Sequence, residues 1–249
     1  MHRAGLHYIG GLDISFRSLE SDDAVATLCV LSFPALKLLE TFSESVKLGN
    51  PYVPSFLSFR EAEPLCELLE RYHKTGRVFP QILLVDGNGR LHERQCGSAT
   101  AIGVLSGIPT IGIAKEYHSP SSDQPASHFR SSQKSFRNET NKLRKKGQWI
   151  GIPDDSCSYL LSGVSCPTFT RLNTSETVRQ ALKSSDSASR TIFVSSGHRI
   201  GLPASLSLAL LSTKVGRVPE PIRLADQHSR QEILKLYGPA QPDQDRDLR

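Results

Sequence analysis

An aspartate ends a short apolar segment in the sequence QILLVDGNG, which spans Gln81 to Gly89. Four consecutive apolar residues precede Asp86, and glycines that do not easily continue a strand follow it. An unbroken apolar segment between turn residues indicates a strand buried on both faces. In open α/β sheets, ligands bind beyond the carboxyl ends of such strands. The pattern therefore places Asp86 where chemistry is expected, although an aspartate that only begins a glycine-rich turn is the alternative.

A second aspartate, Asp13, lies inside another apolar segment, YIGGLDISF at 8–16. Acidic residues are depleted in strands, and a buried carboxylate needs a partner. If this strand lies beside the strand that ends at Asp86, the two carboxylates converge and repel each other unless a cation neutralises them. Carboxylate oxygens select Mg²⁺ or Mn²⁺, and such a site suits phosphodiester hydrolysis. The alternative for Asp13 is a solvent-exposed residue on an edge strand.

Composition restricts the class of protein. A chain of 249 residues suits one large domain or two small ones, and its net charge of +5 suits a polyanionic partner or simply a solvated basic surface. The cysteines include no CxxC pair, which argues against zinc and favours free thiols in a reducing compartment. No signal-peptide core or membrane-length apolar segment is evident. We therefore expect a soluble protein of the cytoplasm, the nucleus or both.

The order of the expected elements predicts an α/β fold with a mixed sheet flanked by helices. The first three strands follow one another closely, as in an antiparallel meander, and later strands alternate with helices, as in parallel pairing. The expected strands lie at 8–16, 24–33, 36–48, 82–86, 110–114 and 191–195, and the expected helices at 59–73, 97–105, 202–211 and 220–237.

Two segments differ in composition from the rest. Residues 119–146 are rich in Ser, Gln, Asn and basic residues and have almost no apolar periodicity, which predicts a mobile basic insertion. Residues 239–249 read as a disordered tail. Residues 1–238, with this insertion within them, form a single predicted domain.

Six segments resemble endonuclease V, a family of inosine-specific nucleases with an RNase H-like fold. They are GLDISF (11–16), PYVPSFLSFRE (51–61), LLVDGNGRLH (83–92), GIAK (112–115), SSGHRI (195–200) and PEPIRLAD (219–226). They occur in the family's order and span most of the chain, outside the insertion and the tail. The resemblance implies an RNase H-like mixed sheet and one catalytic domain.

The resemblance implies six catalytic residues: Asp13, Glu61, Asp86, Lys115, His198 and Asp226. Asp13 and Asp86 would bind the catalytic Mg²⁺, for which Mn²⁺ would substitute. Glu61 would join them directly or through water, and Asp226 would be a further acid nearby. Lys115 would contact the scissile phosphate or position water, and His198 would lie in the metal's outer shell or near the attacking water. Taken alone, each could instead be structural or solvated, Glu61 as an exposed acid in the first turn of a helix.

Eight further residues are implied to bind substrate: Pro51, Tyr52, Val53 and Pro54 as the family's wedge, and Leu57, Gly87, Gly89 and His92 around the base. Prolines stiffen a loop, and an aromatic side chain at its tip can enter a base stack. Ser55 stands where the family usually has Gly, which alters the wedge. A flipped hypoxanthine would be read on its Watson–Crick edge by backbone groups.

Together, these residues and the resemblance imply a monomeric, Mg²⁺-dependent endonuclease that acts at inosine in single-stranded RNA and also in DNA. By resemblance, it would hydrolyse the second phosphodiester 3′ to inosine and leave 3′-hydroxyl and 5′-phosphate ends. One alternative is a protein that binds inosine-containing RNA without cutting it, which would not need acids beside phosphates. Another is a different RNase H-like nuclease, such as a junction resolvase, which the PYVP wedge disfavours.

Overall fold

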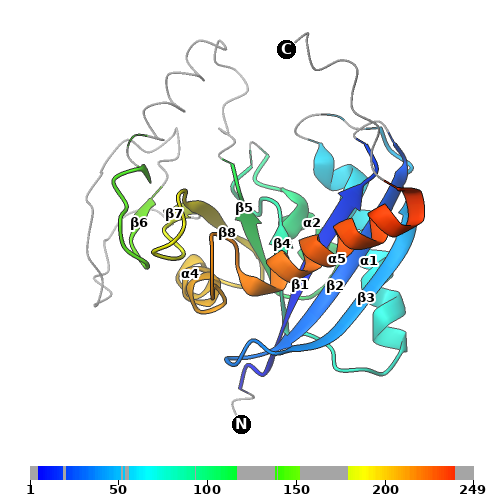
Figure 1. The fold of residues 1–249 in the computed structure, drawn as a ribbon, viewed down its shortest axis with the longest axis horizontal. Coiled ribbons are helices and arrows are strands. Elements are labelled where there is room, and N and C mark those ends of the chain that lie inside the picture. Colours follow the sequence, from blue (N-terminus) through cyan, green and yellow to red (C-terminus); the bar gives the residue numbers. More distant parts are fainter. Residues whose placement is uncertain are drawn as a thin grey trace.

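A mixed sheet of eight strands forms the centre of the computed structural model (Figure 1), in the order β3-β2-β1-β4-β5-β8-β7-β6. The structure describes residues 5–18, 21–51, 53, 56–92, 94–116, 138, 140–151 and 179–238. The strands are β1 (Tyr8–Phe16), β2 (Asp23–Ser32), β3 (Leu38–Lys47), β4 (Ile82–Asp86), β5 (Thr110–Ala114), β6 (Trp149–Gly151), β7 (Arg179–Leu182) and β8 (Ile192–His198). The helices are α1 (Leu57–Lys74), α2 (Ser98–Ser106), α4 (Leu202–Leu211) and α5 (Glu220–Tyr237).

The mode of strand pairing changes twice across the sheet, from antiparallel to parallel and back to antiparallel. β1, β2 and β3 form an antiparallel meander, and β1, β4 and β5 are parallel, which confirms the predicted mixed sheet. β8 then pairs with β5 in the antiparallel direction, and β7 and β6 continue antiparallel. The sequence pattern did not predict the antiparallel pairing of β8 with β5. The direction of β8 decides which of its side chains lie near the site.

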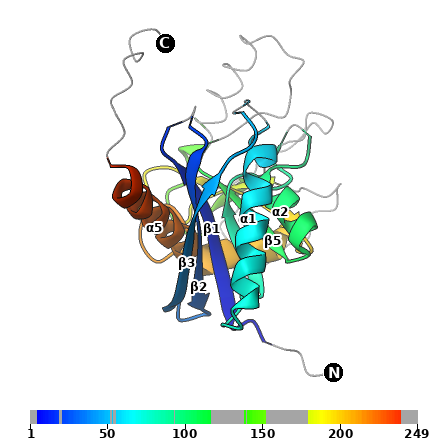
Figure 2. The ribbon, with the colours of Figure 1, turned by 90° about the vertical axis from the view of Figure 1, so that its right-hand side faces the viewer.

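Helices cover both faces of the sheet, α1 and α2 on one side and α5 on the other (Figure 2). The alternation along β1 matches these two layers. Leu12 and Ile14 pack in the core beneath α1 and α2, whereas Ile9 packs in the core beneath α4 and α5. Asp13 therefore faces α5, on the side of the strand opposite Leu12 and Ile14.

A glycine lets α5 approach the sheet closely. A Cβ at Gly11 would lie 2.1 Å from the carbonyl oxygen of Pro221 and 2.8 Å from the backbone nitrogen of Ile222, both at the start of α5. No side chain fits at such distances, so the absence of one at Gly11 sets the separation between helix and strand. Asp226 lies on this same helix, and its distance from Asp13 depends on that separation.

The described end of the predicted insertion is attached to the fold. Leu143 is buried, and the backbone N–H of Lys146 donates to Asp186 Oδ1 at 2.7 Å. The N–H groups of Arg144 and Lys145 both donate to Gln148 Oε1. Most of 119–146 and all of 239–249 lie outside the described residues. No helix within the described ranges is long and apolar enough to cross a membrane.

Candidate active site

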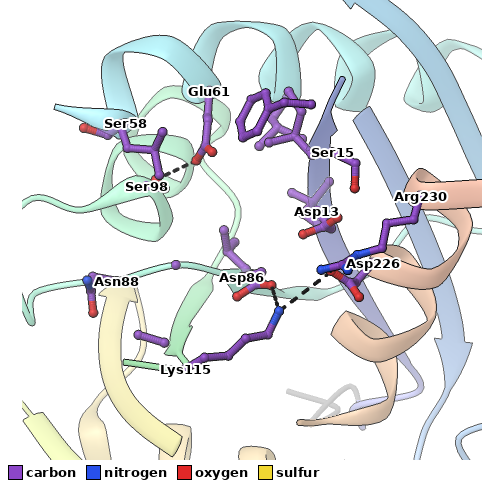
Figure 3. A pocket seen from close by; sticks show the side chains of 18 of the residues that line it. Asp13, Ser15, Ser58, Glu61, Asp86, Asn88, Ser98, Lys115, Asp226 and Arg230 are labelled. Carbon is purple, nitrogen blue, oxygen red and sulfur yellow. Dashed lines mark hydrogen bonds and ion pairs between the residues drawn. The ribbon is translucent and has the colours of Figure 1, made fainter. Parts of the chain in front are cut away.

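A cavity of about 760 Å³ opens where β4 and β5 end, bounded by α1 and α5. Five of the six predicted catalytic residues line it: Asp13, Glu61, Asp86, Lys115 and Asp226. Figure 3 shows their side chains converging on one space from opposite walls. The cavity thus lies beyond the carboxyl end of a buried strand, as the sequence pattern at Asp86 indicated.

Three aspartates from three different elements meet in this cavity. Asp13 projects from β1, Asp86 ends the neighbouring parallel strand β4, and Asp226 lies on α5. Each offers one carboxylate oxygen, and these oxygens all lie within 4.8 Å of one another. The sequence reasoning assigned metal binding to Asp13 and Asp86 alone, whereas the geometry makes Asp226 an equal member of the cluster.

Asp13 is the most buried of the three aspartates, and a hydroxyl holds it. Ser229, one helical turn after Asp226, donates from Oγ to Asp13 Oδ2 at 2.6 Å, and its Oγ also lies 2.8 Å from Ser15 Oγ. Burial, followed by repulsion from Asp86, raises the pKa of Asp13 from 3.8 to about 7. Without a bound cation, burial and the charge of Asp86 therefore favour the protonated form of this carboxyl.

Glu61 reaches the cavity from the opposite wall. It lies on α1 and is 5% exposed, so the alternative of an exposed acid in the first helical turn is wrong. Ser98, at the start of α2, donates from Oγ to Glu61 Oε2 at 3.1 Å. Burial raises the pKa of Glu61 from 4.5 to about 8. Glu61 is not among the three acids that approach within 4.8 Å, in keeping with a more distant role.

Lys115 follows the last residue of β5 and points back to the acids. Its Nζ lies 2.5 Å from Asp86 Oδ2 and 3.8 Å from Asp226 Oδ1. Burial alone would lower its pKa, but the attraction of Asp86, assisted by Asp226, outweighs burial and raises the pKa of Lys115. Lys115 is therefore a paired cation within the site, which rejects the alternative of an ordinary solvated lysine.

The donor set fits a hard divalent cation. Among the His, Cys, Asp and Glu side chains of the described residues, the group that converges here consists of three carboxylates, and oxygen ligands of this kind suit Mg²⁺ and Mn²⁺. The structure already holds a positive charge there, because the Lys115 ammonium group lies between Asp86 and Asp226. The cluster is thus built to be neutralised by a cation.

His198 does not join the acids. It pairs with Thr110 at the start of β5, whereas Lys115 follows the other end of that strand, so about 13 Å of strand separates the two ends. A Cβ at Gly103 would lie 2.3 Å from His198 Cβ, which places this histidine against α2. The reason is strand direction: a parallel β8 would bring His198 to the acidic edge, and the antiparallel β8 carries it away.

Three of the four residues predicted around the base line the cavity: Leu57, Gly87 and His92. Gly89 does not, because its N–H donates to Ser195 Oγ and its carbonyl accepts from the N–H of Gly97, both at 2.9 Å. Gly89 thus connects the segment after β4 to β8 and to the start of α2, and does not face the cavity. Asn88 lines the cavity instead, and its buried Oδ1 accepts no hydrogen bond within the described part of the chain.

The predicted wedge is only partly described. Pro51 and Val53 precede α1, and the Val53 side chain is exposed. Asn50 donates from Nδ2 to the carbonyl of Phe59 at 2.9 Å, which ties this segment to the first turn of α1. Tyr52 and Pro54 lie outside the described residues, as does Ser55, so the wedge stays a prediction.

Sequence reasoning missed the residues that position the acids. Ser229 and Ser98 gave no motif of their own. Ser229 could have been found, because it lies three residues after Asp226 and therefore on the same helical face. Ser98 had no comparable signal, because its partner Glu61 is on another helix.

Comparison with known proteins agrees with this geometry. The family model for Endonuclease V matches residues 1–227. Human Endonuclease V is 36% identical over 237 residues, which cover 94% of this chain and 74% of the human one. The crystal structure of human ENDOV superposes with a TM-score of 0.75 at 34% identity, over 93% of this chain and 86% of that one.

A second structural relative was crystallised with nucleic acid. It is an Endonuclease V from Ciona intestinalis, in complex with a 23mer DNA that contains an inosine followed by a ribo-adenosine. It superposes with a TM-score of 0.72 at 31% identity, over 94% of this chain and 88% of that one. From the family match, these likenesses and the acidic cavity, we conclude that the chain belongs to the endonuclease V family of endonucleases.

Proposed function

We propose that this chain is a metal-dependent endonuclease that recognises inosine and hydrolyses the nucleic-acid backbone on its 3′ side. The observation that carries the proposal is one cavity that holds both the acidic triad and the three residues Leu57, Gly87 and His92. A base and a nearby phosphodiester could therefore be bound together. The relative crystallised with inosine-containing DNA supports the choice of base.

The acids and Lys115 would act on the phosphodiester. Asp13, Asp86 and Asp226 would hold a divalent cation, which when bound would offset negative charge on the attacking and leaving oxygens. Lys115 is already charged at this place and can move its ammonium group from Asp86 to a phosphate oxygen. Glu61, fixed by Ser98, can hold or release a proton near neutral pH at the opposite wall.

The other part of the cavity would read the base. Leu57 offers an apolar wall, and Gly87 presents backbone without a side chain, at a position where a Cβ would already lie 3.3 Å from Ser98 Cβ. Hypoxanthine presents an O6 acceptor and an N1–H donor, unlike adenine, and lacks the 2-amino group of guanine. Backbone groups can read the first difference and a close wall the second. By family resemblance, the cut is at the second phosphodiester 3′ to inosine, in single-stranded RNA and in DNA.

The test compares matched oligonucleotides that differ only at one base. RNA and DNA strands carry inosine, adenosine or guanosine at the same position and are incubated with Mg²⁺, Mn²⁺ or EDTA. We expect cleavage only of the inosine strand, only with metal, and at one phosphodiester on its 3′ side. Equal cleavage of inosine and adenosine strands would refute base recognition, and full activity in EDTA would refute the metal. Binding of inosine strands without any cleavage would favour the non-cutting alternative.

A further inference from the structure

Two phenylalanines lie exposed at the start of α1, next to the cavity. Phe56 and Phe59 are 38% and 66% exposed, and their ring centroids are 5.8 Å apart at an angle of 41°. Leu57 and Ser58, which lie between them in the sequence, line the cavity. The aromatic pair therefore continues the cavity wall onto the surface.

A positive charge from a different segment joins this pair. The Cζ atom of Arg94 lies 3.8 Å from the centroid of the Phe56 ring, which is the geometry of a stacked cation–π pair. Arg94 belongs to the loop between β4 and α2, and its N–H donates to Nδ1 of the cavity residue His92 at 3.2 Å. Two separate segments thus place an aromatic surface and a guanidinium group together at the mouth of the cavity.

Core packing does not account for Phe59. The buried face of α1 is formed by other side chains, among them Leu65, Leu68 and Tyr72, whereas Phe59 is two thirds exposed to solvent. An apolar surface of this kind beside a cavity is typical of a binding site. The two phenylalanine rings favour a planar ligand, and the positive charge of Arg94 favours a ligand that carries a negative charge. The expected ligand is therefore a planar group attached to an anion.

A nucleobase on a phosphodiester backbone has those properties. A base turned into the cavity leaves its neighbours in the strand without their stacking partner. Aromatic side chains and arginine replace such stacking on bound single strands. We propose that Phe56, Phe59 and Arg94 form a stacking site for a nucleobase that flanks the base held in the cavity. This inference rests on the proposed function and adds a second base-binding site to it.

The test pairs a protein change with a matching substrate change. Phe59→Ala removes the exposed ring, Phe59→Leu keeps an apolar side chain without a ring, and Leu105→Ala removes a comparably exposed apolar side chain (65%) from α2 as a control. Single-stranded substrates carry inosine with its 5′ or its 3′ neighbour intact or abasic. Single-turnover cleavage and fluorescence anisotropy are measured for every combination, and circular dichroism confirms folding.

We expect Phe59→Ala and Phe59→Leu each to reduce kcat/KM roughly 5- to 150-fold on the intact strand, the range of one base stacked on an aromatic side chain. The kcat/KM of wild-type protein should fall by a similar factor when one of the two neighbours is abasic. On that strand, the kcat/KM of the Phe59 variants should equal that of wild type. Leu105→Ala should match wild type. The stacked base is the neighbour whose removal abolishes the difference in kcat/KM between wild type and the Phe59 variants.

Equal losses from Phe59→Ala on intact and abasic strands would overturn the stacking site, and so would an unchanged kcat/KM on the intact strand. Failure of the proposed function would look different. In that case wild-type protein would treat inosine and adenosine strands alike, whatever residue occupies position 59.

Discussion

Replacing Glu61 by glutamine should make the metal-free protein more stable at alkaline pH. Burial raises the pKa of Glu61 from 4.5 to about 8 in the folded state. Between these two pH values, the folded chain keeps a proton that the unfolded chain has lost. The free energy of unfolding must therefore fall as pH rises through this window and level off above pH 8. Glutamine has no proton to lose there, so the variant lacks this decline.

The size of the effect follows from the same two pKa values. Their difference of about 3.5 units, at 1.36 kcal/mol per unit, corresponds to about 5 kcal/mol across the window. A typical domain is stable by roughly 5–15 kcal/mol, so this loss is large. Glutamine keeps a side-chain oxygen that can accept the hydrogen bond from Ser98 Oγ. The difference in the free energy of unfolding between the variant and wild type should consequently shift in favour of the variant by about 1.4 kcal/mol for each pH unit from 5 to 8.

The measurement is urea unfolding in EDTA from pH 4.5 to 8.5, for wild type, Glu61→Gln and Glu63→Gln. Glu63 lies on the same helix but is exposed, so its variant is the matched control and should follow wild type. Adding Mg²⁺ or Mn²⁺ at pH 8 should stabilise wild type, because a ligand that binds only the folded state stabilises it. Parallel curves for wild type and Glu61→Gln from pH 5 to 8 would refute the claim that burial holds a proton on Glu61.

Three further substitutions test the remaining parts of the site. Asp86→Asn removes a carboxylate of the proposed metal site and the partner of Lys115. Single-turnover cleavage should therefore nearly vanish while gel-shift affinity for an inosine strand persists, and cleavage near the wild-type rate would contradict the proposed role of Asp86. Ser229→Ala removes the hydroxyl that holds Asp13, and the apparent metal affinity from a Mg²⁺ titration of cleavage should fall roughly 10- to 100-fold, whereas an unchanged titration would make Ser229 merely structural. Tyr52→Ala should lower kcat/KM on inosine substrates by the equivalent of roughly 1–3 kcal/mol, and equal values for variant and wild type would remove Tyr52 from the wedge.

Local patterns predicted six of the eight strands, all except β6 and β7, and two of the three aspartates of the triad. Alternation along β1 placed Asp13 on the face opposite Leu12 and Ile14, and the apolar segment before Asp86 predicted a buried strand with its end at the site. Both predictions needed only the side-chain period of a strand and the position of its end. The family resemblance added Glu61 and Lys115, which no local pattern singles out.

Long-range geometry was out of reach of these patterns. The position of His198 depends on the direction of β8, and a strand has the same alternation in either direction. The membership of Asp226 in the acidic cluster depends on how closely α5 packs on β1. That packing is decided by contacts between residues more than two hundred positions apart. The burial of Glu61 likewise results from packing that periodicity does not report.

The missing side chain at Gly11 also means that the acidic cluster can be opened without changing any acid. A methyl group at this position would have to move the backbone at Pro221 by about 1 Å, from 2.1 Å to at least 3.0 Å, because the atoms it meets are backbone and cannot rotate away. α5 would carry Asp226 and Ser229 with it, so Gly11→Ala should weaken metal binding while all three carboxylates remain in the chain. Spacing between a strand and a helix is thus a quantity that substitutions at Gly11 can tune, and the metal titration of Gly11→Ala would reveal how much separation the cluster tolerates.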